Sequence, residues 1–383
     1  MRRVAHPWIA GAGPGKRRRT CIAGRHGRSR DRASPAPITI DAGARRFQIE
    51  RDGQVRSLPP RALPFPRDAA WFPGTGVWFA IRHRHLIVGR WRATLWRSTG
   101  QYRAALHVGA VTIGHHAVVF SYRTGGTEWL YVSSLGGHER PVARNEEPVG
   151  WTSGGFYAYR YRGRQLLLRS DTGALEQTVL RAPPSYLYDD ATESLYSIAR
   201  GELMRSHGAR TEAVASLARL GVPVKKSSVE LVPVGRLLEL LTNQRLILLR
   251  LDGSLFAETR LPTPDGALAG DVALAPDGHA AAFPSPASQR RRAVGIETVY
   301  LLRAGAHAAS ALHDEHANLG GCVIGASLQW HGRWLLYSAT GGYLAVIDST
   351  GRAPAVELTS IAERLSRPSA AVSAYWSGHP PGL

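Results

Sequence analysis

Cysteine, lysine and long apolar runs are all scarce in this sequence. Cys21 and Cys322 lie far apart and neither has a CxxC neighbour, so a structural disulfide is not expected. No stretch of about 18 apolar residues occurs, which argues against a transmembrane helix. The basic, proline-interrupted N-terminus lacks the apolar segment of a secretory signal. A cytoplasmic location is therefore favoured, with export expected if the true start lies elsewhere.

Positive charge is carried almost wholly by arginine. The formal net charge is +19, yet the only lysines are Lys16, Lys225 and Lys226. Together with abundant alanine and glycine, this bias is typical of GC-rich coding DNA, so the charge alone does not favour nucleic acid as a partner. Residues 1–45 show no periodicity and are expected to form a disordered basic segment, with a flexible tail over 367–383.

A repeat begins near Arg46. Each unit reads as a short strand, a second strand rich in aromatic and aliphatic residues, a third apolar strand ending in a glycine turn, and a fourth strand. The second strands are expected at 77–82, 117–122, 156–161, 194–199, 237–241, 280–283 and 334–339. The matching turn glycines are Gly100, Gly136, Gly173, Gly208, Gly253, Gly305 and Gly351.

The spacing of these units indicates the fold class. Four short strands with their connections need about 40 residues, the size of one propeller blade. A lone blade cannot bury both faces of its sheet, whereas packing against neighbouring blades does so. The sequence therefore predicts an all-β chain with a single β-propeller over residues 46–366. Seven four-stranded blades are favoured and six or eight stay open; a pair of β-sandwiches is the competing architecture.

The closing strands and the helices are less clearly marked. Phe47–Leu58 reads as two strands joined by an Asp52-Gly53 turn. This hairpin could latch the last blade to the first, or form half of an eighth blade completed from Ser369–Gly378. Short helices are expected at Glu212–Leu220 and, from a capping-box pattern, at Ser360–Glu363.

One segment resembles a known repeat. Leu274–Phe283 contains Ala275-Pro276-Asp277-Gly278 followed by an apolar strand ending in phenylalanine, which is similar to the repeat of TolB-like (WD40-like) β-propellers. Trp330–Tyr337 looks like a degenerate copy. Propellers of this kind occur as periplasmic scaffolds, as domains ahead of serine peptidases and as isolated binding modules, so the resemblance implies the fold and not a single function.

Motifs for catalysis and metal binding are weak. Gly325–Gln329 fails to complete a Gly-x-Ser-x-Gly elbow, and no cofactor is expected. The nearest approach to a metal site is His313, Asp314, Glu315 and His316, where two histidines and two carboxylates could hold a divalent ion. The alternative interpretation of these four residues is a solvated loop between the last two blades. The pairs His115-His116 and His83/His85 are expected on blade strands.

Arginines are concentrated where carboxylates are missing. No Asp or Glu occurs between Asp68 and Glu128. This window supplies a candidate anion-binding surface, which consists of Arg82, Arg84, Arg90 and Arg92. Because side chains alternate along a strand, Arg90 and Arg92 are expected on one face and Trp91 on the other. The competing interpretation is an outer blade face on which arginine stems cover apolar surface.

Three functions are compatible with these features. The leading hypothesis is a monomeric, non-enzymatic binding module or scaffold that holds a protein or peptide partner on one propeller face. The second is a propeller hydrolase or lyase with a divalent cation bound in its channel. The third is a binder of anionic polymers, nucleic acid among them, through the arginine-rich window.

Overall fold

A computed structural model describes residues 34–42, 45–59, 69–71, 77–181, 185–222, 230–234, 236–242, 244–261, 268, 270–286, 297–315, 326–339, 343–359 and 372–377. These residues form eight four-stranded antiparallel sheets and one 3-10 turn, η1 (Ala105–His107). They divide into two compact units, one within residues 62–224 and one within residues 15–61 and 225–381. None of the helices in the described part is long and apolar enough to cross a membrane.

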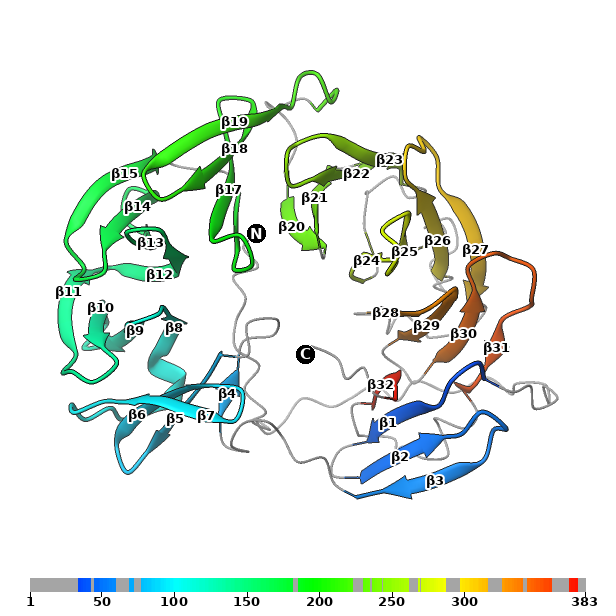
Figure 1. Ribbon diagram of the computed structural model, residues 1–383, viewed down its shortest axis with the longest axis horizontal. Helices are drawn as coiled ribbons and strands as arrows, with labels where there is room; N and C mark the ends of the chain where they lie inside the picture. The colour runs from blue at the N-terminus through cyan, green and yellow to red at the C-terminus, as the bar shows by residue number, and fades with distance from the viewer. Residues whose placement is uncertain are drawn as a thin grey trace. The chain divides into compact units, whose positions relative to one another are not determined.

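The first unit contains four sheets, each built from four consecutive strands (Figure 1). Its strands are β4 (Ala70–Trp71), β5 (Val77–Arg82), β6 (His85–Arg90), β7 (Ala93–Arg97), β8 (Val108–Ile113), β9 (Ala117–Thr124), β10 (Thr127–Ser134), β11 (Arg140–Arg144), β12 (Glu146–Thr152), β13 (Gly155–Arg160), β14 (Gln165–Ser170), β15 (Leu175–Arg181), β16 (Tyr186–Asp189), β17 (Ser194–Ala199), β18 (Glu202–His207) and β19 (Arg210–Ser216). In every sheet the strands are hydrogen-bonded in chain order, which is the blade unit of a β-propeller.

The second unit also contains four sheets. Three of them follow the same consecutive order, and the fourth has the order β3-β2-β1-β32. The strands are β1 (Ile38–Ala42), β2 (Arg45–Ile49), β3 (Val55–Leu58), β20 (Glu230–Val234), β21 (Leu237–Leu241), β22 (Arg245–Arg250), β23 (Leu255–Arg260), β24 (Ala273–Leu274), β25 (Ala280–Pro286), β26 (Glu297–Arg303), β27 (Ser310–Glu315), β28 (Ala326–His331), β29 (Trp334–Ala339), β30 (Leu344–Asp348), β31 (Val356–Glu357) and β32 (Val372–Trp376).

All seven second strands expected from the repeat are confirmed as the second strand of a sheet. The reason is visible in β9, where both faces are buried: Val118 and Phe120 face one hydrophobic cluster and Val119 faces another. Six of the seven expected glycines lie in the turn between the third and fourth strands. Gly100 instead follows β7, and the corresponding turn of its sheet is formed by Trp91 and Arg92.

The segment that resembles the TolB-like repeat forms a tight hairpin. Gly278, with a φ of +71°, donates its N–H to the carbonyl of Ala275 at 2.9 Å. The Asp277 carboxylate accepts the N–H of His279 at 3.0 Å, and Ala275 donates to the carbonyl of Ala280 at 2.8 Å. Glycine accommodates this left-handed conformation without the steric cost of a Cβ, so the Pro-Asp-Gly sequence is suited to the turn between β24 and β25.

The outer edges of the sheets are irregular. In six sheets the pairing of the third and fourth strands contains a register shift. Such bulges twist an edge strand and weaken its ability to pair with another chain. The unpaired edge of the fourth strand is therefore a poor template for adding a further strand.

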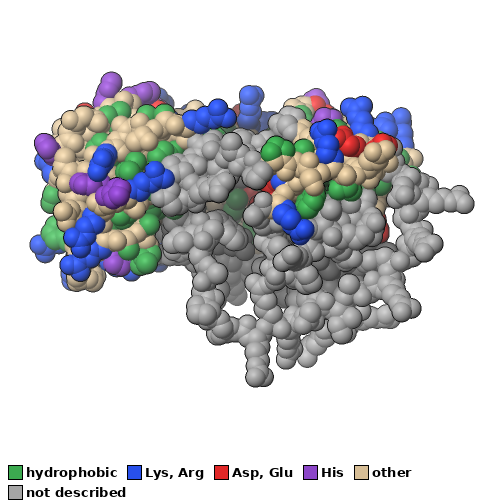
Figure 2. Space-filling model, turned by 90° about the horizontal axis from the view of Figure 1, so that it is seen from below, with side chains coloured by type: hydrophobic (Ala, Val, Ile, Leu, Met, Phe, Trp, Pro, Cys, Tyr) green, Lys and Arg blue, Asp and Glu red, His purple; other side chains and the backbone are tan. Residues whose placement is uncertain are grey.

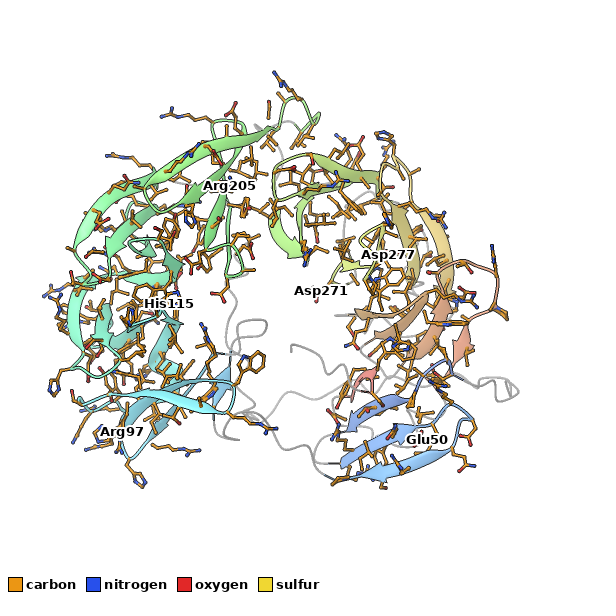
Figure 3. All side chains as sticks on the ribbon, in the orientation of Figure 1. Glu50, Arg97, His115, Arg205, Asp271 and Asp277 are labelled. Atoms are coloured by element: carbon orange, nitrogen blue, oxygen red, sulfur yellow. The ribbon has the colours of Figure 1, made fainter. Side chains whose placement is uncertain are left out.

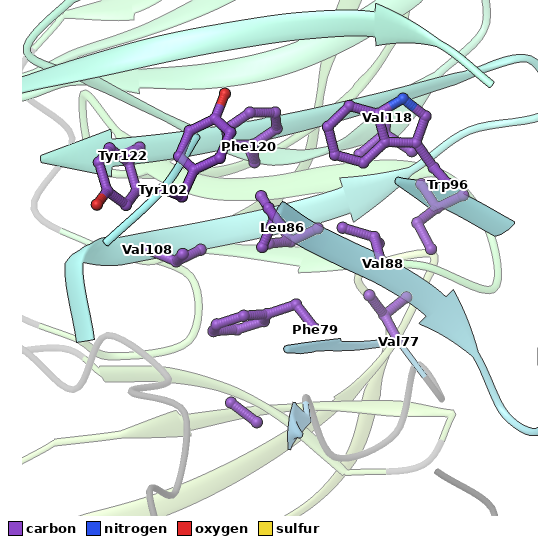
Figure 4. Packing of buried hydrophobic residues seen from close by; sticks show 13 residues of the cluster. Val77, Phe79, Leu86, Val88, Trp96, Tyr102, Val108, Val118, Phe120 and Tyr122 are labelled. Carbon is purple, nitrogen blue, oxygen red and sulfur yellow. The ribbon is translucent and has the colours of Figure 1, made fainter. Parts of the chain in front are cut away.

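Neighbouring sheets are held together by apolar side chains. Between the β4–β7 and β8–β11 sheets, Phe79 and Val88 share a cluster with Phe120 and Tyr122 (Figure 4). The Tyr102 ring meets Tyr122 edge-on, with centroids 4.8 Å apart. Burial of each such aromatic side chain contributes about 1.5–3 kcal/mol relative to exposure.

A carboxylate links the same two sheets at their outer side. Glu139, in the turn between β10 and β11, accepts the N–H and hydroxyl of Thr99 at 3.0 Å each and the N–H of Gly100 at 2.5 Å. The hydroxyl of Tyr102 donates to the same carboxylate at 3.3 Å. Burial opposes ionisation of Glu139, but the hydrogen bonds from Thr99 and Gly100 outweigh it and hold its pKa below the usual value.

The terminal ranges expected outside the propeller each contribute a strand, which corrects those boundaries. β1 lies within 1–45, β32 lies within 367–383, and the two pair antiparallel, with Thr39 opposite Tyr375. The Phe47–Leu58 hairpin supplies β2 and β3. The fourth sheet of the second unit matches the alternative in which the hairpin and the tail form an eighth sheet, so the described residues form eight sheets where seven were favoured. A lone strand carries no repeat signal, which is why β1 was missed. Residues 1–33 lie outside the described part.

The helix expected at Glu212–Leu220 is wrong. Residues up to Ser216 belong to strand β19, which pairs with β18, so that Glu212 lies opposite Arg205. Turns follow Ser216. The hydrogen bonds of the sheet and burial of its face override a weak local helical pattern. Ser360–Glu363 lies outside the described residues.

Removal of Trp376 should destabilise the second unit. This side chain is fully buried on β32 and donates its indole N–H to the carbonyl of Gln329 at 3.0 Å. Trp376→Ala should lower the free energy of unfolding by about 3–5 kcal/mol, measured by urea denaturation. Val55→Ala, at an exposed position on β3 of the same sheet, is the matched control and should change it by less than about 0.5 kcal/mol. Equal effects of the two substitutions would contradict the assignment of β32 to this sheet.

Glu139→Gln should weaken the link between the first two sheets in a pH-dependent way. Because the pKa of Glu139 is lowered in the folded state, its stabilisation is fully present above its usual value of 4.5 and is lost as the pH falls through the lower folded-state pKa. The variant should lose about 1–2 kcal/mol at pH 7 and show a shallower loss of stability below pH 4.5. Urea denaturation at pH 7 and at a pH below 4.5 measures the free energy of unfolding of both proteins, with the exposed Glu176→Gln as control. Parallel acid slopes in wild type and Glu139→Gln would argue against the link.

Candidate functional site

The four metal-ligand candidates do not lie in a loop as a group. His313, Asp314 and Glu315 end strand β27, and His316 lies outside the described residues. The His313 Nε2 atom lies 2.7 Å from the hydroxyl of Tyr343, within hydrogen-bonding distance. No three His, Cys, Asp or Glu side chains of the described part are arranged to hold a metal ion.

Arg82 and Arg84 lie at one end of the β4–β7 sheet. The chain reverses between Arg82 and His85 through His83 and Arg84, which have positive φ values of 47° and 67°. Two successive left-handed residues form the hairpin turn that fits the twist of antiparallel strands. The Arg84 guanidinium contacts the side chain of Gln101 at 3.4 Å. His83 lies in the turn and not on a strand, where it was expected.

Arg90 and Arg92 lie at the other end of the same sheet. Arg90 ends β6 and pairs with Ala93, so Trp91 and Arg92 form the turn, with a φ of +49° at Trp91. The expectation that Arg90 and Arg92 share one strand face is therefore wrong, because the chain reverses between them. The indole N–H of Trp78 donates to the Trp91 carbonyl at 2.7 Å and holds the turn.

The structure thus divides the four candidate arginines into two pairs. β6 runs from His85 to Arg90, and a strand of this length spans roughly 17 Å. Arg82 with Arg84 and Arg90 with Arg92 are separated by this length, so one small anion cannot contact all four. Alternation along the sequence could not reveal the separation, since it depends on where the two hairpins turn.

The turn and the outer strand β7 expose apolar side chains among arginines. Trp91 and Leu95 are 36% and 37% exposed. The buried Trp96 points toward the next sheet and donates its indole N–H to Ser133 Oγ at 3.0 Å. Because neighbours on a strand point to opposite faces, Leu95 and Arg97 point outward.

We call this group, Trp91, Arg92, Leu95 and Arg97, the arginine–tryptophan surface. Figure 2 shows blue and purple side chains over the face of the first unit that carries the β4–β7 sheet, with few red ones among them. Figure 3 labels Arg97 on this sheet. In the sequence, only the carboxylate-free window pointed to Leu95 and Arg97. Their exposure could not be predicted, because it depends on the register shift in β7.

A buried charged cluster on the β12–β15 sheet has a structural role. The buried Glu146 carboxylate accepts the Nε–H of Arg169 at 2.8 Å and a guanidinium N–H of Arg160 at 2.8 Å. Arg169 also donates to the carbonyl of Gly173 at 2.6 Å. With both carboxylate oxygens engaged by arginine, this cluster fixes the β12–β15 sheet and is not a ligand site.

No protein-family model and no curated protein sequence matches the chain. Solved structures of similar fold include BamB from Moraxella catarrhalis, 14% identical over 76% of this chain and 85% of that one, with a TM-score of 0.42. Hsv2 from Kluyveromyces lactis is 9% identical over 71% and 89%, with a TM-score of 0.41. AztD from Citrobacter koseri is 11% identical over 89% and 97%, with a TM-score of 0.43. The described sheets, seven of which have their four strands in chain order, give the chain the all-β class and the blade architecture of a β-propeller.

Proposed function

We propose that this chain is a non-enzymatic binding module that holds a protein partner on the arginine–tryptophan surface. The observation that carries the proposal is the exposure of Trp91 and Leu95 together with Arg92 and Arg97 on a sheet whose strands contain no carboxylate. Tryptophan and arginine are the residue types that most often dominate the energy of protein interfaces.

The chemistry of this surface favours a partner with acidic and apolar side chains. Arg92 and Arg97 supply planar donors that fit carboxylates, while Trp91 and Leu95 supply apolar area that is costly to leave in water. The register shift in β7 disfavours addition of a partner strand, so contact is expected through side chains.

Photocrosslinking tests the proposal directly. A photoreactive phenylalanine in place of Trp91 should crosslink one defined protein from native extract, whereas the same group in place of the exposed Leu175 on β15 should not. In binding assays with the identified partner, Trp91→Ala should weaken affinity about 30-fold, the loss typical of an interface hot spot. Arg92→Glu combined with Arg97→Glu should slow association and weaken its dependence on salt.

Matched substitutions on another outer strand serve as controls. Leu175→Ala and Arg181→Glu change exposed residues of β15 and should leave affinity within about twofold. Identical crosslinks from positions 91 and 175, or an unchanged affinity of Trp91→Ala, would refute the proposed surface.

A further inference from the structure

In the first unit, every turn between the second and third strands of a sheet carries arginine. The four turn segments, 82–85, 123–127, 160–165 and 199–201, contain no Asp or Glu. Their exposed arginines are Arg84, Arg123, Arg162, Arg164 and Arg200. By contrast, the turns at the other ends of the second strands and between third and fourth strands include Glu139, Asp171, Asp190 and Glu193. Basic and acidic side chains are thus separated to opposite ends of the sheets.

Backbone contacts bring the first two of these turns together. The sheets follow one another in chain order (Figure 1), and the segment between β7 and β8 contacts the turns of both. Tyr102 donates its backbone N–H to the carbonyl of Arg84 at 2.6 Å. The N–H of Arg103 donates to the hydroxyl of Tyr122 at 2.9 Å, and Tyr122 immediately precedes Arg123. Arg84 and Arg123 therefore flank one connecting segment.

The third and fourth turns are joined to the same face. Asn145, the single residue between β11 and β12, donates its N–H to the carbonyl of Glu128 at 2.7 Å and accepts the N–H of Tyr161 at 3.0 Å. It thereby links the ends of the second and third turns. The Tyr159 ring stacks on Tyr186 with centroids 5.3 Å apart, which aligns the corresponding ends of the third and fourth sheets. The four turns consequently share one face of the unit.

An apolar side chain stands on this arginine-rich face. Leu106, in η1 of the segment between β7 and β8, is 70% exposed, and η1 contacts both β5 and β9. Among the described residues, no other exposed large apolar side chain lies in this segment or in the four turns. We call Leu106 and the five exposed arginines the basic turn face. Leaving a leucine in water is costly, so this face is suited to a partner that is both anionic and apolar.

We propose that the basic turn face binds the surface of an anionic lipid bilayer. The arginine guanidinium groups contact the lipid phosphates, and Leu106 enters the boundary between headgroups and acyl chains. A negatively charged bilayer attracts each basic side chain near its surface. Single-stranded nucleic acid is less suited, because its bases stack on exposed aromatic rings and the four described turns contain none.

This face is separate from the arginine–tryptophan surface and shares no residue with it. The Trp91–Arg92 turn follows the end of β6, whereas the Arg84 turn precedes its start. The inference therefore stands or falls independently of the protein partner proposed above.

Sedimentation of the full chain with lipid vesicles tests the proposal. The protein should bind vesicles of phosphatidylcholine in which about one third of the lipid is phosphatidylserine, and not vesicles of phosphatidylcholine alone. Raising the sodium chloride concentration from about 0.05 M to about 0.5 M should release it. Arg162→Gln combined with Arg200→Gln should lower the partition coefficient about 25-fold, which is about fivefold for each arginine. Leu106→Ala should lower it about tenfold, and Leu106→Trp should preserve binding.

Matched substitutions away from this face serve as controls. Arg140→Gln combined with Arg210→Gln removes two exposed arginines that begin the fourth strands β11 and β19, and Leu175→Ala removes an exposed leucine. Both should leave the partition coefficient within about twofold. Failure to bind the phosphatidylserine vesicles would overturn the proposal, as would equal losses in the controls or full binding by the Arg162–Arg200 double variant. Binding of single-stranded RNA without binding of vesicles would instead assign the face to nucleic acid.

Discussion

Burial of both faces of each sheet is the constraint on which this protein depends. A four-stranded sheet has two apolar faces, and β9 shows how both are covered: Phe120 enters the cluster shared with the β4–β7 sheet and Val119 enters the one shared with the β12–β15 sheet. A single sheet would leave one face in water. The repeat is therefore stable only when neighbouring sheets pack together, as in other repeat folds.

The same constraint leaves the outer strands free for interaction. In the β4–β7 sheet, four of the six residues of β5 are buried, whereas four of the five residues of β7 are exposed and only Trp96 is buried. Register shifts make these edges unsuitable for pairing with another chain, so their side chains can vary without loss of the core. The exposed Trp91 and Leu95 are thus tolerated by the fold.

Polar groups packed inside the first unit fall into two kinds. Glu139 and Glu146 are saturated by hydrogen bonds from neighbouring residues and stabilise the packing. The Nε of Arg90 and Nε1 of Trp151 are buried without an acceptor among the described residues. N–H and hydroxyl donors of neighbouring residues satisfy the two carboxylates of the first kind.

The sequence by itself determined the all-β class, the position of seven second strands and most of the turn glycines, because a strand buried on both faces is a continuous apolar run and a positive φ in a tight turn favours glycine. Tertiary structure decided the pairing of β1 with β32, since the two strands are more than 300 residues apart and neither carries a repeat signal. It also decided which arginines meet. Whether Arg90 shares a strand face with Arg92 depends on the chain reversal at Trp91, and residue order does not record this reversal.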